Sequence, residues 1–464
     1  MKTLLAERLS QQELLELEAQ YCSYGDTVHY CEQPIVFDHC EGSWLYDMQG
    51  TPYLDVQMWY SAVNFGYRNK EIEEAHNRQM NRLPQVASQY LHKEKILLAA
   101  TIARETEKRF GSKGRVHFNV GGAQAVEDSI KLVRNYKKGK SLMFAFMGGY
   151  HGRTLAATEI TSSFRYRKRY GHFGSRATFI PYPYCYRCFY GKELTTCGYE
   201  CVRQFEKLFE TEYYGVIDTK ENDVEYAAFF VEPVQATGGY IIPPPEYFMR
   251  LATVLRKYGI FLVDDEIQMG FYRTGKLWAF EHFGAKPDIV AFAKSLTNGL
   301  NPLSGIWARE ELITPKMFPP GSTHSTFSSN PLGTAAGLAT MELLGKHDFA
   351  KIVSEKGQYL VSRLKNLQKK HAVIGDVDGL GMAIRIEMTR SDGFTPDKQL
   401  TDRIFQEGMK GDIQVDGKKY GLVLDVGGYY KNVFTLAPAL TMTQEEIDLF
   451  IRLFESLVKR CARN

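Results

Sequence analysis

Several features that would assign this chain to a specialised class of protein are missing or scarce. Only 8 of its 464 residues are cysteine, far below the density of a disulfide-stabilised secreted domain. No run of about 18 apolar residues occurs, so we expect no transmembrane helix. The N-terminal segment also has no continuous apolar stretch of the kind found in signal peptides. The 57 basic and 54 acidic residues leave a net charge of +3, which argues against a nucleic-acid-binding surface. We therefore expect a cytoplasmic protein that binds neither membranes nor nucleic acid.

The middle of the chain alternates between apolar runs and amphipathic segments. Residues 227–234 and 259–267 are apolar runs of the kind found in buried strands of a parallel sheet. Between them, residues 247–258 place Phe248, Leu251 and Leu255 on one helical face. A strand, a helix and a strand with short connections indicate the βαβ unit of a doubly wound α/β domain.

The two ends of the chain have a different pattern. Residues 46–63 predict short strands around a turn at Gly50, after an N-terminal helix. From about residue 335 onward the pattern predicts long helices and two strands, and a last helix over 444–462 with Thr443 as its N-cap. We expect a large domain over residues 66–335 and a smaller α+β domain built from both ends, residues 1–65 and 336–464.

Polar residues with chemical potential follow two of the predicted strands. Asp264, Asp265 and Glu266 end the strand at 259–267, and Lys294 ends a second apolar strand at 287–294. The carboxyl ends of parallel strands line the ligand crevice in α/β folds. The carboxylates alone are compatible with a solvated loop or ion pairs, or with a partner for a protonated ring nitrogen of a cofactor. Lys294 is compatible with an ordinary surface lysine or, if desolvated, with an amine nucleophile.

Two glycine-containing turns add to this pattern. Gly121 and Gly122 precede a helix predicted to reach residue 136, where backbone N–H groups and the helix dipole favour a phosphate. Most glycine pairs are merely turns, so this signal is weak alone. Tyr150 and His151 lie beside Gly149, and their rings are suited to stacking on a planar ligand.

Taken together, these motifs resemble the class III aminotransferases, which use pyridoxal 5'-phosphate. The resemblance extends from about residue 47 to residue 443. It rests on Asp265-Glu266-Ile267-Gln268 followed by Gly270 to Gly275, on Pro287 to Leu296 around Lys294, and on Tyr150 to Thr154. Glu232-Pro233-Val234-Gln235 and Thr326-Phe327 with Asn330-Pro331 fall in the same order as in the family.

The resemblance implies a fold-type-I transferase and a role for each matching residue. Lys294 would bind the cofactor as an internal aldimine and carry a proton, and Asp265 would keep the pyridine nitrogen protonated. Tyr150 would stack on the cofactor ring and is the third predicted catalytic residue, after Lys294 and Asp265. The remaining cofactor-binding residues implied are Gly122, Ala123, His151, Glu232, Gln268 and, from the neighbouring subunit, Thr326. A homodimer with its active sites at the interface is also implied.

The chain departs from the family pattern at the substrate side. Many members carry an arginine in the motif R-x-x-P-x-L, which grips the substrate carboxylate, whereas this chain has Thr435 there. Either another arginine such as Arg385 holds the substrate carboxylate, or the preferred amino donor carries no α-carboxylate there. The predicted substrate-binding residues are Trp59, Tyr60 and Thr435, and the two aromatic rings suit a bulky apolar donor.

Four cysteines form a separate cluster in the sequence. Cys185 and Cys188, followed by Cys197 and Cys201, have a spacing that can hold tetrahedral zinc. Disulfides and packed free thiols are the alternatives, and Arg187 between the cysteines is expected to face solvent. We assign no metal ligand.

The sequence therefore predicts a pyridoxal-phosphate-dependent aminotransferase that moves an amino group from an amine or amino acid to a 2-oxo acid by a Schiff-base ping-pong mechanism. An amino-acid racemase or epimerase on the same scaffold is the main alternative. A non-catalytic cofactor-binding protein is disfavoured because Lys294 and Asp265 are both present. An NAD-linked oxidoreductase is excluded because no G-x-G-x-x-G motif follows the first strand.

Overall fold

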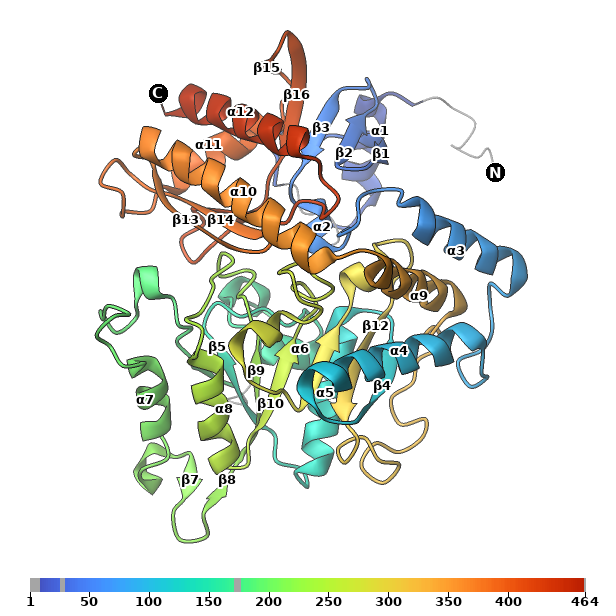
Figure 1. The fold of residues 1–464 in the computed structure, drawn as a ribbon, viewed down its shortest axis with the longest axis vertical. Helices are drawn as coiled ribbons and strands as arrows, with labels where there is room; N and C mark the ends of the chain where they lie inside the picture. Colours follow the sequence, from blue (N-terminus) through green and yellow to red (C-terminus); the bar gives the residue numbers. More distant parts are fainter. Residues whose placement is uncertain (1–8, 26–29, 171–176, 463–464) are drawn as a thin grey trace.

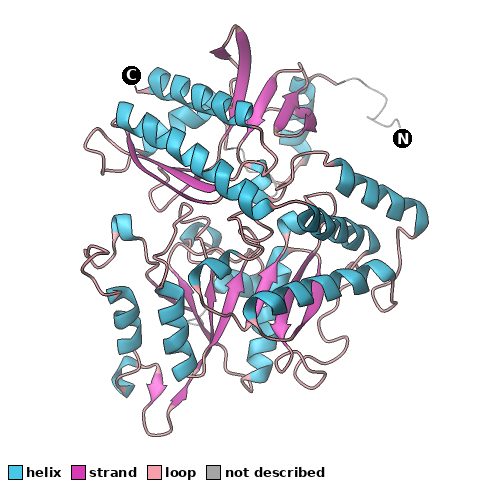
Figure 2. Cartoon of the chain, in the orientation of Figure 1, coloured by secondary structure: helices cyan, strands magenta, loops and turns pink. Residues whose placement is uncertain are grey.

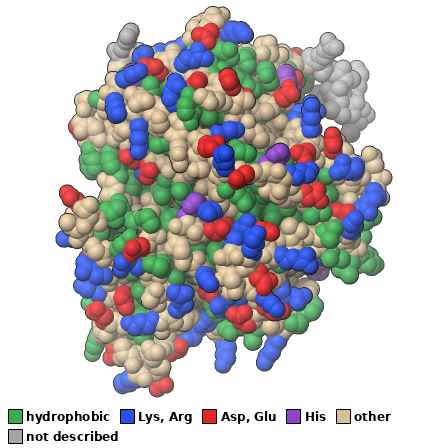
Figure 3. Space-filling model, in the orientation of Figure 1, with side chains coloured by type: hydrophobic (Ala, Val, Ile, Leu, Met, Phe, Trp, Pro, Cys, Tyr) green, Lys and Arg blue, Asp and Glu red, His purple; other side chains and the backbone are tan. Residues whose placement is uncertain are grey.

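The computed structural model describes residues 9–25, 30–170 and 177–462. A large α/β layer structure lies at one end of the molecule, and a smaller α+β part built from both chain ends covers it (Figure 1). In the described residues, no helix combines the length and apolar character needed to span a bilayer. Figure 3 shows basic and acidic side chains interspersed over the face drawn, consistent with the small net charge.

A seven-stranded sheet forms the centre of the large part, with the order β4-β12-β11-β10-β9-β5-β6. Its strands pair in parallel except β12, which runs antiparallel to both neighbours. The strands are β4 (Gly114–Asn119), β5 (Leu142–Phe146), β6 (Ala177–Ile180), β9 (Tyr226–Val231), β10 (Phe261–Asp265), β11 (Ile289–Phe292) and β12 (Ser304–Arg309). This sheet confirms the predicted doubly wound, mainly parallel architecture.

Helices cover both faces of this sheet (Figures 1 and 2). On one face, Val263 packs with residues of α5, whereas its neighbour Leu262 packs on the opposite face with residues of α4 and α8. Alternate side chains of β10 are thus buried in different cores, because successive side chains of a strand point to opposite faces. The helices of the large part are α3 (Lys70–Arg82), α4 (Lys93–Phe110), α5 (Gly122–Tyr136), α6 (Leu155–Glu159), α7 (Glu200–Lys207), α8 (Tyr247–Lys257) and α9 (Pro331–Lys346).

Two further sheets and three long helices form the smaller part. The five-stranded sheet has the order β1-β2-β3-β16-β15, and the four-stranded sheet has the order β13-β14-β18-β17. Their strands are β1 (Phe37–Glu41), β2 (Trp44–Asp47), β3 (Pro52–Asp55), β13 (Ile374–Leu380), β14 (Ala383–Met388), β15 (Ile413–Val415), β16 (Lys418–Val423), β17 (Val426–Gly427) and β18 (Val433–Leu436). The helices are α10 (Phe349–Lys370), α11 (Lys398–Gly408) and α12 (Gln444–Cys461), and the Thr443 side chain caps α12 as predicted.

The remaining elements are short or peripheral. Helix α1 (Gln11–Tyr21) has no buried residue, and β7 (Ile217–Asp218) and β8 (Asp223–Val224) form a separate hairpin. The boundary predicted between residues 335 and 336 falls inside α9, which packs against α3 and α4 in the core of the large part. We therefore propose that the second boundary of the large domain lies after α9.

Candidate active site

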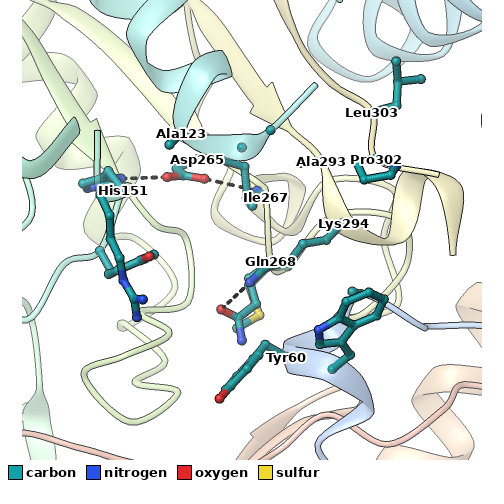
Figure 4. A pocket seen from close by; sticks show the side chains of 18 of the residues that line it. Tyr60, Ala123, His151, Asp265, Ile267, Gln268, Ala293, Lys294, Pro302 and Leu303 are labelled. Carbon is teal, nitrogen blue, oxygen red and sulfur yellow. Dashed lines mark hydrogen bonds and ion pairs between the residues drawn. The ribbon is translucent and has the colours of Figure 1, made fainter. Parts of the chain in front are cut away.

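A cavity of about 640 Å³ opens at the carboxyl ends of the parallel strands, and residues of α2 (Met58–Ser61) close its other side. Lys294, Asp265, His151 and Gln268 line it, together with the first residues of α5 (Figure 4). Lys294 and Asp265 follow neighbouring strands, because Asp265 on β10 pairs with Ala291 on β11. A cavity of this size accommodates a cofactor together with a small substrate.

Lys294 lies at the start of a short 3-10 turn, Lys294–Thr297, directly after β11. Its backbone has a φ of 44°, a left-handed conformation that non-glycine residues adopt mainly at functional sites. Its Nζ donates to Gln268 Oε1 over 3.1 Å (Figure 4). Burial lowers the pKa of Lys294 to about 8, although the nearby carboxylates of Asp265, Glu232 and Asp425 oppose this shift. Both the ammonium form and the neutral, nucleophilic amine form of Lys294 are therefore populated near neutral pH.

Asp265 is held in one orientation from two sides. His151 Nδ1 lies 2.7 Å from Asp265 Oδ2, and the Ile267 N–H donates to Oδ1 over 3.1 Å (Figure 4). Burial lowers the pKa of His151, but its hydrogen bond to Asp265 and the negative charge there outweigh burial, so the pKa is raised overall. This pairing favours a protonated His151 ring opposite the Asp265 carboxylate on the cavity wall.

The two acids next to Asp265 lie away from the cavity lining. Asp264 and Glu266 are both fully buried, and the pKa of each is raised by burial, for Glu266 to about 8. Glu266 Oε1 accepts from the Phe280 N–H over 2.8 Å. Of the three carboxylates that the sequence left open, the structure places only Asp265 at the cavity.

Glu232 is a buried acid on the cavity wall, after β9. Its Oε1 accepts from the Tyr150 N–H over 2.9 Å and its Oε2 from the Ala236 N–H over 3.1 Å. Burial raises the pKa of Glu232 to about 7, with Asp265 acting in the same direction and His151 opposing it. No arginine pairs with Glu232 among the described residues.

The first turn of α5 faces the cavity with free backbone donors. Gly121 caps the helix, and Gly122 and Ala123 line the cavity. Within residues 9–25, 30–170 and 177–462, neither the Gly122 nor the Ala123 N–H has a hydrogen-bond acceptor. A Cβ at Gly122 would come within 3.1 Å of Ile267 Cδ1, so the close packing of this turn favours glycine. Two free N–H groups at the positive end of a helix fit a phosphate group.

The aromatic residues of α2 lie across the cavity from this helix end. Four consecutive residues, Met58 to Ser61, have φ values of 45°, 52°, 56° and 63°, so α2 is a left-handed turn. Left-handed helical backbone costs roughly 1–2 kcal/mol per non-glycine residue. The turn is held by Asp55 Oδ1, which accepts the Gln57 and Met58 N–H groups over 2.8 Å each, and by the buried Arg273, which donates to Ser61 Oγ over 2.9 Å. These contacts fix Trp59 and Tyr60 on the cavity wall.

Two predicted residues lie outside this cavity lining. Thr326 is exposed on the loop before α9, away from the cavity of its own chain. Thr435 is buried on β18, and its hydroxyl donates to Asp425 Oδ2 over 2.6 Å. Thr435 therefore contacts the Asp425 carboxylate and does not line the cavity.

Two arginines have roles other than those expected. Arg385, considered as an alternative carboxylate holder, is buried and pairs with Glu387 and, over 3.4 Å, with Asp376. Arg187, expected to face solvent, also pairs with Glu387. Both guanidinium groups belong to a buried structural network, because their carboxylate partners are already in place.

The four clustered cysteines line one small cavity of about 30 Å³. Burial raises the pKa of Cys185 to about 11 and that of Cys201 to about 12, which favours protonated thiols. The structure contains free cysteines here, and in its described residues no three His, Cys, Asp or Glu side chains are arranged to hold a metal ion.

The structure also brings residues to the site that the sequence reasoning did not assign. Arg153 lines the cavity with its guanidinium carbon 4.7 Å from the Tyr166 ring centroid. Burial lowers the pKa of Arg153, but the nearby Tyr150, Tyr166 and Tyr30 raise it overall, and no carboxylate pairs with Arg153 in the described part of the chain. Tyr240 accepts a hydrogen bond from Gln268 Nε2 over 2.8 Å. Arg153 directly follows the Tyr150-His151-Gly152 motif, which could have identified it, whereas Tyr240 has no local signal.

The chain is similar to known proteins over most of its length. The family model described as aminotransferase class-III matches residues 27–458. A leucine/methionine racemase of Thermococcus litoralis is 32% identical, with 95% of this chain and 94% of the relative covered. An ornithine aminotransferase of Saccharomyces cerevisiae is 28% identical, with 95% of this chain and 96% of the relative covered.

Solved structures give the same result. An aminotransferase of Bacillus anthracis superposes with a TM-score of 0.85 at 26% identity, covering 99% of this chain and 100% of that one. An amine transaminase from an uncultivated Pseudomonas species, solved in its PLP-bound form, superposes with a TM-score of 0.82 at 25% identity, covering 95% of this chain and 98% of that one.

Proposed function

Because the chain belongs to the class III aminotransferase family, we propose that it transfers an amino group from an amine or amino acid to a 2-oxo acid, with the residues of the cavity in the roles given below. The family is pyridoxal-phosphate-dependent, and the fold is the fold-type-I transferase architecture predicted from the sequence. The proposal rests chiefly on the pair of Lys294 and Asp265 at neighbouring strand ends of one cavity.

The residues present fit the cofactor. The free N–H groups of Gly122 and Ala123 would hold its phosphate, and the Asp265 carboxylate would hold its ring nitrogen. Tyr150 would lie against the ring, and Gln268 and Thr326 would complete the binding set, Thr326 from a second subunit. When bound, the cofactor supplies an electron sink that lowers the barrier to removal of the proton on the substrate carbon next to nitrogen.

The chain's own groups would do the remaining work. The Lys294 amine takes the proton from the substrate carbon and returns it, which its lowered pKa of about 8 permits near neutral pH. His151 keeps Asp265 oriented through the 2.7 Å contact. Arg153 lines the cavity without a carboxylate partner of its own, so it can bind the carboxylate of a substrate. Thr435 has no positive charge with which to bind that carboxylate, and Arg385 already pairs with Glu387.

A direct assay tests the transfer. The protein loaded with pyridoxal 5'-phosphate is incubated with an amine or amino acid and a 2-oxo acid such as pyruvate, and formation of the new amino acid is measured by chromatography. Product that requires both substrates supports the proposal. No product from a broad panel of donors and acceptors would contradict it.

Racemase activity is the second candidate, because a leucine/methionine racemase is among the similar proteins at 32% identity. A racemase needs no oxo acid. A single enantiomer of leucine or alanine is therefore incubated with the loaded protein alone, and the opposite enantiomer is measured by chiral chromatography. Its formation without any oxo acid, together with absent transfer, would favour the racemase. The homodimer and the cytoplasmic location stay predictions.

A further inference from the structure

The Gln268 amide, on the cavity lining, lies between two other polar side chains. Lys294 Nζ donates to Gln268 Oε1 over 3.1 Å (Figure 4), and Gln268 Nε2 donates to the Tyr240 hydroxyl over 2.8 Å. As an ammonium group Lys294 only donates hydrogen bonds, so the amide oxygen faces it and the amide nitrogen faces Tyr240. That nitrogen carries two hydrogens, and Tyr240 is its only acceptor in the described part of the chain. One N–H of Gln268 is therefore free for a ligand in the cavity.

The Tyr240 hydroxyl serves Gln268 alone among the residues that the structure describes. The side chain of Tyr240 is only 2% exposed. Burying a hydroxyl group costs free energy unless the group forms a hydrogen bond, and phenylalanine has the same ring without this cost. Packing alone would therefore favour phenylalanine at this position, whereas the contact with Gln268 requires the hydroxyl.

The backbone at Tyr240 has an unusual conformation. Its φ is 49°, in the left-handed region that non-glycine residues adopt uncommonly and that clusters at functional sites. The flanking residues Gln235 and Ile241 exchange two backbone hydrogen bonds, over 3.0 and 3.1 Å. These bonds close the turn that contains Tyr240 and hold its backbone in place.

The Tyr240 ring packs where the two parts of the molecule meet. It belongs to a small buried cluster with Met269 of the large part, Ala383 of β14 and Ala437, which follows β18. Contacts from both parts restrict the ring, since a buried ring has little room to move in a close-packed interior. The hydroxyl is thus a fixed point for the Gln268 amide.

We propose that Tyr240 is a positioning residue, which holds the Gln268 amide ready to donate its free N–H to the phenolic oxygen of the bound cofactor. The inference rests on the proposed function, in which Gln268 belongs to the cofactor-binding set. Tyr240 does not line the cavity and acts through Gln268. Without the hydroxyl the amide rotates more freely in the apoprotein, so ordering it on the cofactor costs more conformational entropy.

The test measures binding and absorbance of pyridoxal 5'-phosphate and does not depend on amino transfer. The variant is Tyr240→Phe, which removes the hydroxyl and keeps the ring in its cluster. The matched control is Tyr247→Phe on α8, because Tyr247 is also fully buried, lies outside the cavity lining and has a hydroxyl without a hydrogen-bond partner in the described residues. Gln268→Ala, alone and combined with Tyr240→Phe, completes a double-mutant cycle.

Equilibrium dialysis should give an apparent Kd for the cofactor that is about 2- to 10-fold higher in Tyr240→Phe, the range of one neutral hydrogen bond. The Kd of Tyr247→Phe should stay within about twofold of the wild-type value. In the Gln268→Ala background, Tyr240→Phe should change the Kd by less than about twofold, because its partner is already gone. An unchanged Kd in Tyr240→Phe, or an equal effect with and without Gln268, would overturn the inference.

A pH titration of the absorbance of the bound cofactor is a second measurement, which a purely structural loss would not change. A hydrogen bond donated to the phenolic oxygen favours its charged form, so without that bond the cofactor keeps a proton up to a higher pH. The midpoint of the absorbance change should therefore rise by about 0.5 pH unit or more in Tyr240→Phe and stay at the wild-type value in Tyr247→Phe. An equal midpoint in Tyr240→Phe and the wild type would contradict the inference alone, whereas a wild-type protein that binds no cofactor would overturn the proposed function and the inference with it.

Discussion

Replacing Asp265 by Asn tests the central electrostatic contact of the site. The side chain is only 5% exposed, and its two oxygens contact His151 and the Ile267 N–H. Asparagine has the same shape, so its oxygen can keep the contact with Ile267, and its NH2 group can donate to His151 Nδ1 once the ring has lost the proton that Asp265 favours. The substitution therefore removes the negative charge with little change in geometry.

The expected loss follows from what the charge does. A carboxylate can hold a bound pyridine nitrogen in its protonated form, whereas a neutral amide cannot. A hydrogen bond to a charged group contributes about 1.5–3 kcal/mol net. Since about 1.36 kcal/mol corresponds to a tenfold change in rate, we expect kcat to fall on the order of 10²-fold, which is about 2.7 kcal/mol.

The assay is the rate of a single turnover, followed by the absorbance of the bound cofactor after mixing with an amino donor. Asp264→Asn is the matched control, because Asp264 is the preceding residue of β10 but is absent from the cavity lining. We expect that variant to react within about threefold of the wild type once circular dichroism shows that it folds. A change below about threefold in Asp265→Asn, or a large loss in Asp264→Asn alone, would show that Asp265 does not hold the ring nitrogen.

The other predictions concern binding, pH and stability. Lys294→Ala should abolish both turnover and the covalent attachment of the cofactor, and a covalent adduct detected by mass spectrometry after borohydride reduction would contradict its role. Only the neutral amine of Lys294 attacks the cofactor, and burial lowers the pKa of this amine to about 8. The rate at which the apoprotein binds the cofactor covalently should therefore rise from about pH 7 to about pH 9, as the neutral fraction of Lys294 rises from about a tenth to about nine tenths. A binding rate that does not change with pH would contradict this. Glu387→Ala leaves the guanidinium groups of Arg187 and Arg385 without their shared partner and should cost about 3–5 kcal/mol in urea unfolding, so a loss below about 1 kcal/mol would show that the network is not needed. Thr326→Val should weaken cofactor binding about 2- to 10-fold, the range of one neutral hydrogen bond, and unchanged binding by equilibrium dialysis would remove Thr326 from the site.

The architecture and the two central residues of the site could be predicted without coordinates. Apolar runs separated by an amphipathic helix predicted β9, α8 and β10, because strands buried on both faces have few polar positions. Asp265 and Lys294 each follow from the end of such a strand, and parallel strands place their carboxyl ends at one edge. Their meeting in one cavity was therefore predictable from local pattern and chain direction alone.

Which polar side chains reach the cavity depends instead on tertiary packing. Asp264, Asp265 and Glu266 are adjacent in sequence, and the packing of helices on the two faces of the sheet leaves only Asp265 on the cavity wall. From the sequence alone, Arg385 is a candidate for binding the substrate carboxylate, but in the folded chain its guanidinium group pairs with Glu387.

Asp425 shows the same limit from the other direction. Its sequence neighbours are apolar and glycine residues after a strand, with no motif around it. It gains its place because β16 pairs with β3, from the opposite end of the chain, and because Thr435 of β18 holds its carboxylate. A local pattern records which residues are buried, but electrostatic fields depend on distances between segments that lie far apart in the sequence, and only the folded chain sets those distances.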